Sequence, residues 1–356
     1  MPPDNPKQPR FRLVIRCLLA LGLGLGIWEI LLRSFFVPIP YHHDPQLGWM
    51  PKPFSHGMVG IEGRAECRYN ERGFRDGPID AAIPGQLRIL CLGDSFTEAP
   101  QIAVEHTFPL QLQSLLRERA DASVRVYNSG RSGTSVPYTL GFASAYREIF
   151  HPDWVVILVR DGWDQAFDRT EEIFYEPIGD SFEIKQQWHW YAMSSALRTL
   201  IEWHIRDFAV FQLGKRQFQD IVGHTTQPAT PAATAAVELQ RELRAIDFTV
   251  EHWRIEYPQL VIVHIPFGAA AIAGLLPPSP EEQALAAACQ RRSVAFISMR
   301  DVIEQDARVS DQPPFGFFNT IPWAGHPNKF GHQLIAKALA DFFLDGKAKL
   351  QAKDPR

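Results

Sequence analysis

The sequence predicts an α/β protein, a three-layer α/β/α sandwich built on a parallel sheet and preceded by one N-terminal transmembrane helix. The first observation is that short apolar runs alternate with longer stretches whose apolar residues recur at helical spacing, from about residue 88 to residue 343. Strands buried on both faces and joined by crossover helices produce this alternation. The second observation is a single long apolar segment near the N-terminus. The chain has 356 residues, which is enough to bury a core without disulfides or metals.

The N-terminal segment sets the expected location of the protein. A polar tail at residues 1–10 is followed by an apolar segment at residues 11–37, which is long enough to cross a hydrocarbon layer of about 30 Å. Four basic residues lie before this segment or near its start: Lys7, Arg10, Arg12 and Arg16. Basic residues tend to stay on the cytoplasmic side. We therefore expect a cytoplasmic tail, a single membrane span and an extracytoplasmic body.

Two other interpretations of the apolar segment remain open. A cleaved signal peptide has the same order of charged and apolar residues, but bulky residues follow the apolar core in place of a small-residue cleavage site. A buried core helix is the third interpretation, although the alternating Gly22, Gly24 and Gly26 suit a membrane helix better than a soluble one. An uncleaved signal anchor is the interpretation that we adopt.

Beyond the span, the chain divides into a lead-in, a main domain and a tail. Residues 38–86 are rich in proline and glycine and predict extended chain with turns and short β-structure. Residues 87–345 form the predicted domain, with an insertion at about 165–258, and residues 346–356 form a polar tail. Apolar runs predict five strands, at 88–93, 124–128, 154–159, 260–266 and 294–298. Helical spacing predicts helices at about 107–119, just before residue 150, across 239–253 and across 330–343.

Polar and glycine-rich segments follow the predicted strands at the points where the strands end. The sequence GDS at 93–95 comes directly after the first strand, and NSGRSGT at 128–134 follows the second. The sequence RDGWD at 160–164 follows the third strand, and WAGHPNKFGH at 323–332 precedes the last helix. The carboxyl ends of parallel strands meet at one edge of a sheet, where open α/β proteins bind their ligands. We therefore expect these segments to build one site.

The order and spacing of two of these segments resemble the GDSL/SGNH hydrolase family. The sequence GDS after an apolar strand is the most specific element, and GHPNKFGH before the last helix is the second. The resemblance spans residues 89–343 and implies a flavodoxin-like fold. It also implies that Ser95 is the nucleophile, that His326 is its general base, and that the backbone N–H groups of Ser95 and Gly133 form the oxyanion hole. Gly130 is the less favoured choice for that role.

The chain departs from the family pattern at two positions. The family offers an Asn side chain after the third strand as another oxyanion donor, and that position here is Gly162 or, with a one-residue shift, Trp163. The family also places an Asp two or three residues before the histidine, where this chain has Ala324 and Trp323. Substitutes for the acid are a backbone carbonyl or one of four side chains: Asp161, Asp164, Asp311 and Asn319. The sequence leaves the choice among them open.

The resemblance implies ester chemistry at the cell envelope. Membrane-anchored bacterial members have a lead-in similar to residues 44–49 and 70–76, which favours a bacterial inner-membrane protein with its body in the periplasm. We expect a serine esterase, acyl hydrolase or acyltransferase that acts on O-acetyl groups of an envelope glycan, or on a lipid, through a Ser–His dyad. The alternative is a relative that has lost its chemistry and binds a glycan or lipid as an envelope assembly factor.

The sequence does not favour other classes of site. The formal net charge is −4, which gives no electrostatic signal for a nucleic-acid partner. The glycine spacing after the first strand matches neither a dinucleotide-binding nor a phosphate-binding loop, so we expect no cofactor. His326 and His332 lack a third ligand nearby in sequence, so we expect no metal site. An oxidising compartment would permit a disulfide between Cys67 and Cys289.

Overall fold

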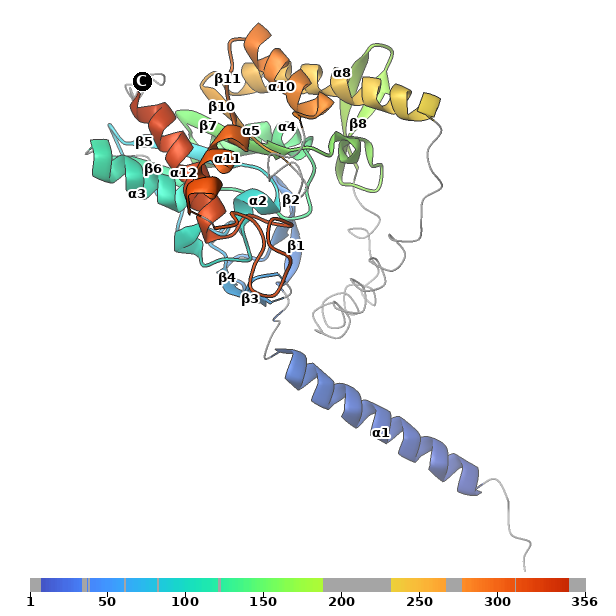
Figure 1. The fold of residues 1–356 in the computed structure, drawn as a ribbon. Coiled ribbons are helices and arrows are strands. Elements are labelled where there is room, and N and C mark those ends of the chain that lie inside the picture. The colour runs from blue at the N-terminus through green and yellow to red at the C-terminus, as the bar shows by residue number, and fades with distance from the viewer. Residues whose placement is uncertain are drawn as a thin grey trace, which may run out of the picture.

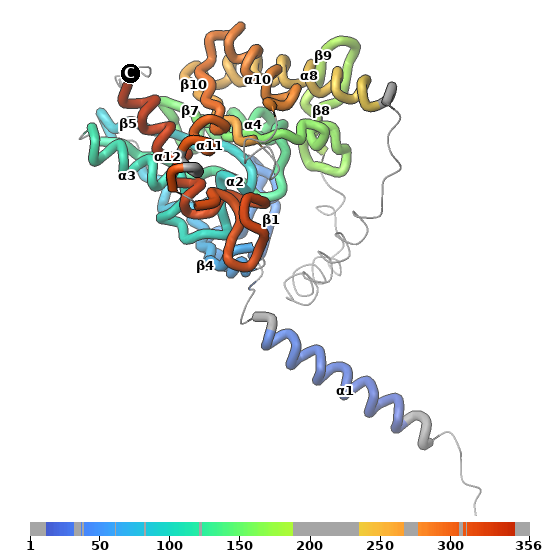
Figure 2. Tube along the Cα trace, viewed as in Figure 1, coloured from blue at the N-terminus to red at the C-terminus, as the bar shows by residue number. Residues whose placement is uncertain are grey.

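The computed structural model describes most of the chain. The described residues are 8–33, 37, 39–60, 62–81, 83–120, 123–187, 232–266, 277–310 and 312–345. A body of α/β structure stands apart from one long N-terminal helix (Figures 1 and 2). The body contains every candidate site residue named above except Asp311, which lies outside the described residues.

A parallel sheet of five strands forms the centre of the body, in the order β11–β10–β7–β5–β6. Its strands are β5 (Leu87–Leu92), β6 (Val124–Asn128), β7 (Trp154–Arg160), β10 (Leu260–Ile265) and β11 (Ala295–Ser298). Each pair of neighbouring strands is parallel, which confirms the predicted sheet and its five predicted strands. Every residue of β5 and β10 is buried, as expected of strands that are covered on both faces.

Alternate side chains of each strand enter two separate apolar cores. Along β5, Leu90 and Leu92 belong to one core, whereas Ile89 and Cys91 belong to the other. The helices that contribute to the first core are α4 (Tyr138–Gly141), α5 (Ala143–Phe150), α8 (Ala232–Glu256) and α10 (Pro280–Arg291). Those that contribute to the second core are α3 (Phe108–Ala120), α11 (Met299–Ser310) and α12 (Lys329–Leu344). The result is the predicted three-layer sandwich (Figure 1).

The lead-in consists of two antiparallel hairpins, β1 (Tyr41–Asp44) with β2 (Gly48–Pro51) and β3 (His56–Val59) with β4 (Ala65–Arg68). Arg75, which follows them, is buried and donates hydrogen bonds to the carbonyl oxygens of Ala99 at 2.6 Å and Ile102 at 2.5 Å. A buried guanidinium needs such partners because it has lost its hydration. These bonds fix the lead-in to the segment that follows the short helix α2 (Ser95–Glu98).

The predicted insertion contains a hairpin that no sequence pattern above predicts. Strands β8 (Ile173–Ile178) and β9 (Ser181–Gln186) pair in antiparallel fashion. Tyr175 and Phe182 of this hairpin are buried in the same core as the apolar face of α8, which the sequence did predict. Helices α10 and α11 were likewise not predicted. Residues 188–231 of the insertion lie outside the described residues.

Within the part of the chain that the structure describes, one helix, α1 (Gln8–Arg33), is long and apolar enough to cross a membrane. Its apolar window runs from Arg12 to Leu31 with a mean hydropathy of 1.9, and none of that window is buried against the rest of the protein. Shortly after the helix, Val37 forms an antiparallel bridge with Met58 of β3, with N···O distances of 3.1 and 2.8 Å. The N-terminal helix is therefore joined to the body at β3.

The disulfide considered for Cys67 and Cys289 does not form. Both thiols are free and buried, and Cys67 Sγ donates instead to the carbonyl oxygen of Pro100 at 3.3 Å. Burial raises the pKa of Cys67 to about 11 and that of Cys289 to about 12. Both side chains are therefore neutral, poorly reactive thiols at neutral pH.

Candidate active site

The chain turns sharply from β5 into α2. Gly93 adopts a φ of +154°, and an added Cβ would lie 2.2 Å from Thr97 Oγ1, so the turn requires glycine. Asp94 then caps α2, because its Oδ1 accepts a hydrogen bond from the Phe96 N–H at 2.8 Å. Since Asp94 supplies the cap, the hydroxyl of Ser95 at the first position of the helix is left for another partner.

The hydroxyl of Ser95 lies beside the imidazole of His326. Ser95 Oγ and His326 Nε2 are 2.7 Å apart, although 231 residues separate them in sequence. Both residues are partly buried, so the pair remains accessible to a ligand. At this distance the ring nitrogen is placed to accept the hydroxyl proton. The two segments that carry the family resemblance therefore meet at the carboxyl edge of the sheet.

The other ring nitrogen of His326 contacts a carboxylate from the lead-in. Nδ1 lies 2.5 Å from Glu62 Oε2, and the backbone N–H of His326 donates to Glu62 Oε1 at 2.8 Å. A carboxylate accepts hydrogen bonds, so the ring proton lies at Nδ1 and Nε2 is the acceptor that faces Ser95. Two hydrogen bonds thus connect the hydroxyl to the imidazole and the imidazole to the carboxylate.

Glu62 takes the position for which the sequence analysis considered other residues, and this is a correction. Asp161 is engaged elsewhere, since its Oδ1 lies 3.1 Å from His264 Nε2 and accepts from Ser279 Oγ at 2.8 Å. Asp164 belongs to the 3-10 helix η2 (Trp163–Phe167) and interacts electrostatically with acidic residues of other helices. Asp311 lies outside the described residues.

Asn319, the fourth side chain considered as a partner of His326, bonds instead to the segment that carries Glu62. Its Oδ1 accepts from the Gly63 N–H at 2.9 Å, and its Nδ2 donates to the Gly60 carbonyl at 3.0 Å. These bonds hold both sides of the segment that carries Glu62. The close approach of Glu62 also requires a glycine before the histidine, because Gly325 has a φ of +78° and an added Cβ would lie 2.2 Å from Glu62 Oε1.

The charge of Glu62 follows from its contact with His326. Partial burial raises the pKa of the Glu62 carboxyl, but the hydrogen bonds from the His326 ring and backbone and the charge of that ring outweigh it, so the net pKa lies below its usual value. The carboxylate is therefore ionised at neutral pH. An ionised acid in this position stabilises the imidazolium that forms when His326 takes up a proton.

Of the two glycines considered for the oxyanion hole, Gly133 is open to the cleft. It has a φ of +77°, an added Cβ would meet no atom within 4 Å, and it lines a cavity of about 370 Å³ together with Ser95. Gly130 is instead packed against α2, since an added Cβ would lie 2.1 Å from the backbone nitrogen of Glu98. Gly133 is therefore the better placed of the two to bring backbone close to a substrate.

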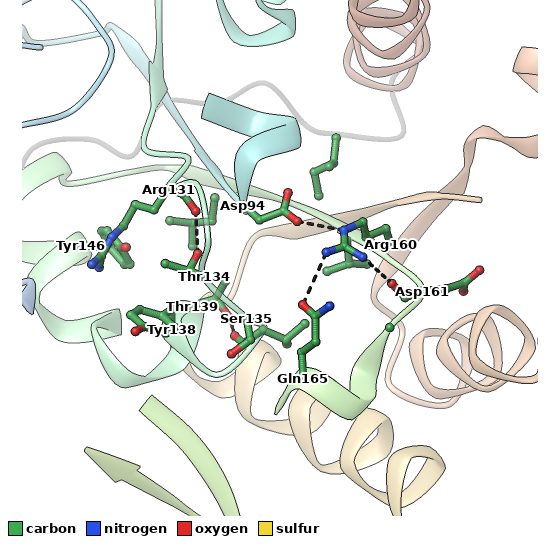
Figure 3. Close-up of a pocket in the computed structure, with 16 residues that line it drawn as sticks. Asp94, Arg131, Thr134, Ser135, Tyr138, Thr139, Tyr146, Arg160, Asp161 and Gln165 are labelled. Carbon is green, nitrogen blue, oxygen red and sulfur yellow. Dashed lines mark hydrogen bonds and ion pairs between the residues drawn. The ribbon is translucent and has the colours of Figure 1, made fainter. Parts of the chain in front are cut away.

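The cleft beside Ser95 is lined by polar groups. The described residues that line it are Asp94, Ser95, Gly133, Thr134, Ser135, Arg160, Gln165, Asp168 and Glu171. None of these residues has an apolar side chain. Figure 3 shows Arg160 between Asp94 and Gln165, where its Nε donates to Asp94 Oδ2 at 3.1 Å and its Nη2 to Gln165 Oε1 at 3.5 Å. A second cavity of about 40 Å³ adjoins the cleft and shares Arg160 and Gln165 with it.

No Asn stands at either position where the family pattern places one, Gly162 or Trp163. Gly162 has a φ of +105°, and an added Cβ would lie 3.2 Å from Arg160 Nη1 and 3.9 Å from Gln165 Nε2. The side chains of Arg160, Asp164 and Gln165 therefore surround Gly162, and of these the Gln165 amide is the uncharged donor. Trp163, the alternative position, is buried in the core, and its backbone N–H donates to Glu281 at 3.0 Å.

Comparisons with known proteins give only distant similarity. No family model and no curated protein matches the chain. Among solved structures, a two-domain esterase active on acetylated mannans aligns with 76% of this chain and 53% of its own, at 13% identity and a TM-score of 0.40. An acetylxylan esterase from Geobacillus stearothermophilus, solved as a catalytic mutant, aligns with 73% of this chain and 94% of its own, at 14% identity and a TM-score of 0.38. An α/β hydrolase from the metagenome of Lake Arreo gives the same two coverages, at 15% identity and a TM-score of 0.36.

The chain thus spans about half the length of the two-domain esterase. At identities and scores of this size, the likeness does not identify a substrate for this chain.

Proposed function

We propose that the protein is a serine ester hydrolase or acyltransferase in which Ser95, His326 and Glu62 act as a catalytic triad. The observation that carries the proposal is the pair of contacts at His326, 2.7 Å to the hydroxyl and 2.5 Å to the carboxylate. A serine hydroxyl is a weak nucleophile unless a base takes its proton, and the base works best when a third group orients it. The triad replaces the Ser–His dyad that the sequence suggested.

The proposed reaction proceeds through an acyl-enzyme. Ser95 Oγ attacks the ester carbonyl carbon while His326 Nε2 takes the hydroxyl proton. The bond to the leaving alcohol then breaks, its oxygen receives the proton from Nε2, and an acyl-serine ester remains. Water, or the hydroxyl of an acceptor, attacks this ester with the same histidine as base, which transfers the acyl group and restores Ser95. Glu62 stays ionised and stabilises the imidazolium at each step.

Three donors are proposed for the oxyanion of the tetrahedral intermediate. The backbone N–H groups of Ser95 and Gly133 are the first two. The third is the side-chain amide of Gln165, which lines the cleft with Ser95. Because Gln165 Oε1 accepts from Arg160, its Nε2 remains as the donor end of the amide. In this proposal the amide comes from η2, a few residues after the position at which the family carries it.

Replacing Gln165 by Ala is expected to lower kcat for an ester substrate about 10²-fold with little change in KM, because an oxyanion donor acts mainly in the transition state. Steady-state kinetics with p-nitrophenyl acetate measure both constants. Gln283→Ala is the matched control, because Gln283 is exposed on α10 and, among the described residues, its side chain bonds to the Pro278 carbonyl alone. An unchanged kcat, or a loss confined to KM, would show that Gln165 is not the donor.

The proposed substrate is a small acyl ester of a polar alcohol, as in an O-acetylated glycan. A long fatty acyl chain gains affinity from apolar walls, and the described lining of the cleft offers none. Asp168, Glu171 and Arg160 offer instead the acceptors and donors that sugar hydroxyls bind. An envelope lipid is therefore the less favoured of the two substrates that the sequence suggested.

A series of p-nitrophenyl esters with lengthening acyl chains tests this substrate class. We expect the highest kcat/KM for acetate and a decline of at least about 10-fold by octanoate, since added methylenes find no apolar pocket. Release of acetate from an O-acetylated polysaccharide is expected in parallel. A kcat/KM that rises with chain length would contradict the glycan proposal and favour a lipid ester.

We further propose that α1 is an uncleaved anchor with its N-terminus in the cytoplasm and the body in the bacterial periplasm. Two observations support this topology. The apolar window of α1 is not buried by the protein, so a bilayer is the environment that would cover it. Arg12 and Arg16 lie at the N-terminal end of the helix, where the positive-inside tendency retains basic residues.

A further inference from the structure

We propose that the loop at residues 315–322 and the groove beside it form a second membrane-contact surface, which seats the body on the bilayer that α1 crosses. The occupant of this surface is the lipid bilayer itself, at the level of the headgroups and upper acyl chains. The inference rests on the proposed anchoring by α1 and does not depend on ester chemistry.

The first observation is a cluster of exposed apolar side chains on the loop. Phe318 is 84% exposed and Ile321 is 74% exposed. Beside them lies a groove of about 550 Å³ whose apolar lining includes Ile102, Pro313, Phe315, Phe317, Pro322 and Phe330. A single exposed apolar residue needs no explanation, but a protruding pair next to an apolar groove is typical of an interaction surface. Lys329 also lines the groove and supplies the positive charge that anionic headgroups attract.

The loop presents these side chains from a well-defined backbone. Phe317 N–H donates to Thr320 Oγ1 at 2.8 Å, and Thr320 N–H donates back to the Phe317 carbonyl at 3.0 Å. The base of the loop is closed because Trp323 N–H donates to the Phe315 carbonyl at 3.0 Å. Internal hydrogen bonds at the tip and base hold Phe318 and Ile321 outward, away from the core.

The second observation is the position of the anchor, which identifies the bilayer as the occupant. Helix α1 ends at Arg33, and Val37 is already bonded to Met58 of β3. Four residues of chain reach at most about 14 Å, so this part of the body stays close to the end of the span. Two residues beyond Met58, the Gly60 carbonyl accepts from Asn319, the neighbour of Phe318. The exposed loop is thus attached to the part of the body that α1 tethers.

The figures agree with this connection. Strands β3 and β4 lie at the end of the body nearest α1, and the orange-red loop that precedes α12 lies beside them (Figures 1 and 2). Because α1 keeps the body at the bilayer, even a weak contact is populated, as in other intramolecular binding events. The same loop region carries Asn319, which holds the Glu62 segment, and leads to His326. Contact with the bilayer therefore places the proposed triad close to the membrane surface.

Fluorescent labels at single cysteines of the full-length chain test the inference. An environment-sensitive nitrobenzoxadiazole label is attached at Phe318→Cys or at Ile321→Cys, each in a chain whose exposed Cys17 is replaced by Ser. The other three native thiols are buried and do not compete for the label. The proteins are reconstituted into vesicles of phosphatidylethanolamine and phosphatidylglycerol. Quenching is measured with phospholipids that carry a nitroxide high on the acyl chain.

Two kinds of control accompany these labels. Val237→Cys is the matched surface control, because Val237 is 70% exposed on α8, a helix at the opposite end of the body from β3 and β4 (Figure 1). The native Cys17 within α1 is labelled in a separate sample and reports insertion of the helix. We expect the labels at 318, 321 and Cys17 to lose about half of their emission or more on quenching, as for side chains that enter the interface, while the label at 237 stays unquenched.

The outcomes separate the two proposals. Quenching at Cys17 without quenching at 318 and 321 would overturn the membrane-contact surface and leave the anchor intact. Absence of quenching at all three positions would overturn the anchoring proposal and this inference with it. Since the readout is fluorescence, neither result bears on ester hydrolysis.

Discussion

Ser95→Ala is expected to lower kcat for p-nitrophenyl acetate by at least about 10⁴-fold, because no acyl-enzyme can form without the serine hydroxyl. The variant should remain folded, since Asp94 and not Ser95 caps α2. Steady-state kinetics of the purified full-length chain in detergent measure the loss. Intact folding is checked by comparing the circular dichroism spectra of parent and variant.

A second serine of the same cleft provides the control for this prediction. Ser135 lines the cleft with Ser95, but its hydroxyl has no hydrogen-bond partner among the described residues. Ser135→Ala is therefore expected to retain most of the activity. An active Ser95→Ala variant, or a loss that follows Ser135 and not Ser95, would show that the nucleophile has been assigned to the wrong residue.

Glu62→Gln is expected to lower kcat by about 10³- to 10⁴-fold, because the amide cannot stabilise the imidazolium and does not fix the tautomer that leaves Nε2 free to accept. Glu62→Asp should recover part of the loss, since it restores the charge at a longer distance from the ring. Glu66→Gln is the matched control, because Glu66 lies on the adjacent β4 and, within the described part of the chain, its carboxylate pairs with the exposed Arg68. Equal activity of the Glu62 and Glu66 variants would exclude Glu62 from the triad.

The contact between Glu62 and His326 also predicts that the free energy of unfolding decreases at acid pH. The pKa of Glu62 is lower in the folded protein than its usual value. At pH values between the lowered and the usual pKa, the folded state therefore binds fewer protons than the unfolded state. Its contribution to the free energy of unfolding is therefore complete above the usual carboxyl pKa and is lost as the pH falls through the lowered value. In Glu62→Gln, the free energy of unfolding should therefore decrease less than in the parent as the pH is lowered through this range.

Local sequence patterns predicted the sheet and one half of the site. The strands were predictable because a parallel strand covered on both faces is rich in apolar residues, and β5, β7 and β10 carry nearly continuous apolar runs. Ser95 and His326 were predictable as neighbours because their segments come at the carboxyl edge of that sheet, where the topology alone brings them together.

The other half of the site depends on contacts that no local pattern marks. Glu62 lies in an irregular segment, 264 residues away from His326, and reaches it only because the lead-in is fixed to the body through Arg75 and Asn319. The one signal in the sequence was Gly325, since a glycine next to the histidine leaves room for a carboxylate on the backbone side. Gln165 escaped prediction for a similar reason, because it lies in η2 and not at the position where the family pattern places the Asn.

Labelling of the full-length chain with a fluorophosphonate, followed by mass spectrometry of the peptides, tests the proposed triad most directly. The reagent phosphonylates a serine only when a neighbouring base activates its hydroxyl. We predict one adduct, on Ser95, that forms far more slowly in Glu62→Gln. An unlabelled parent chain would contradict the triad and favour a binding protein that has lost the chemistry, and an adduct on a different serine would place the catalytic centre elsewhere.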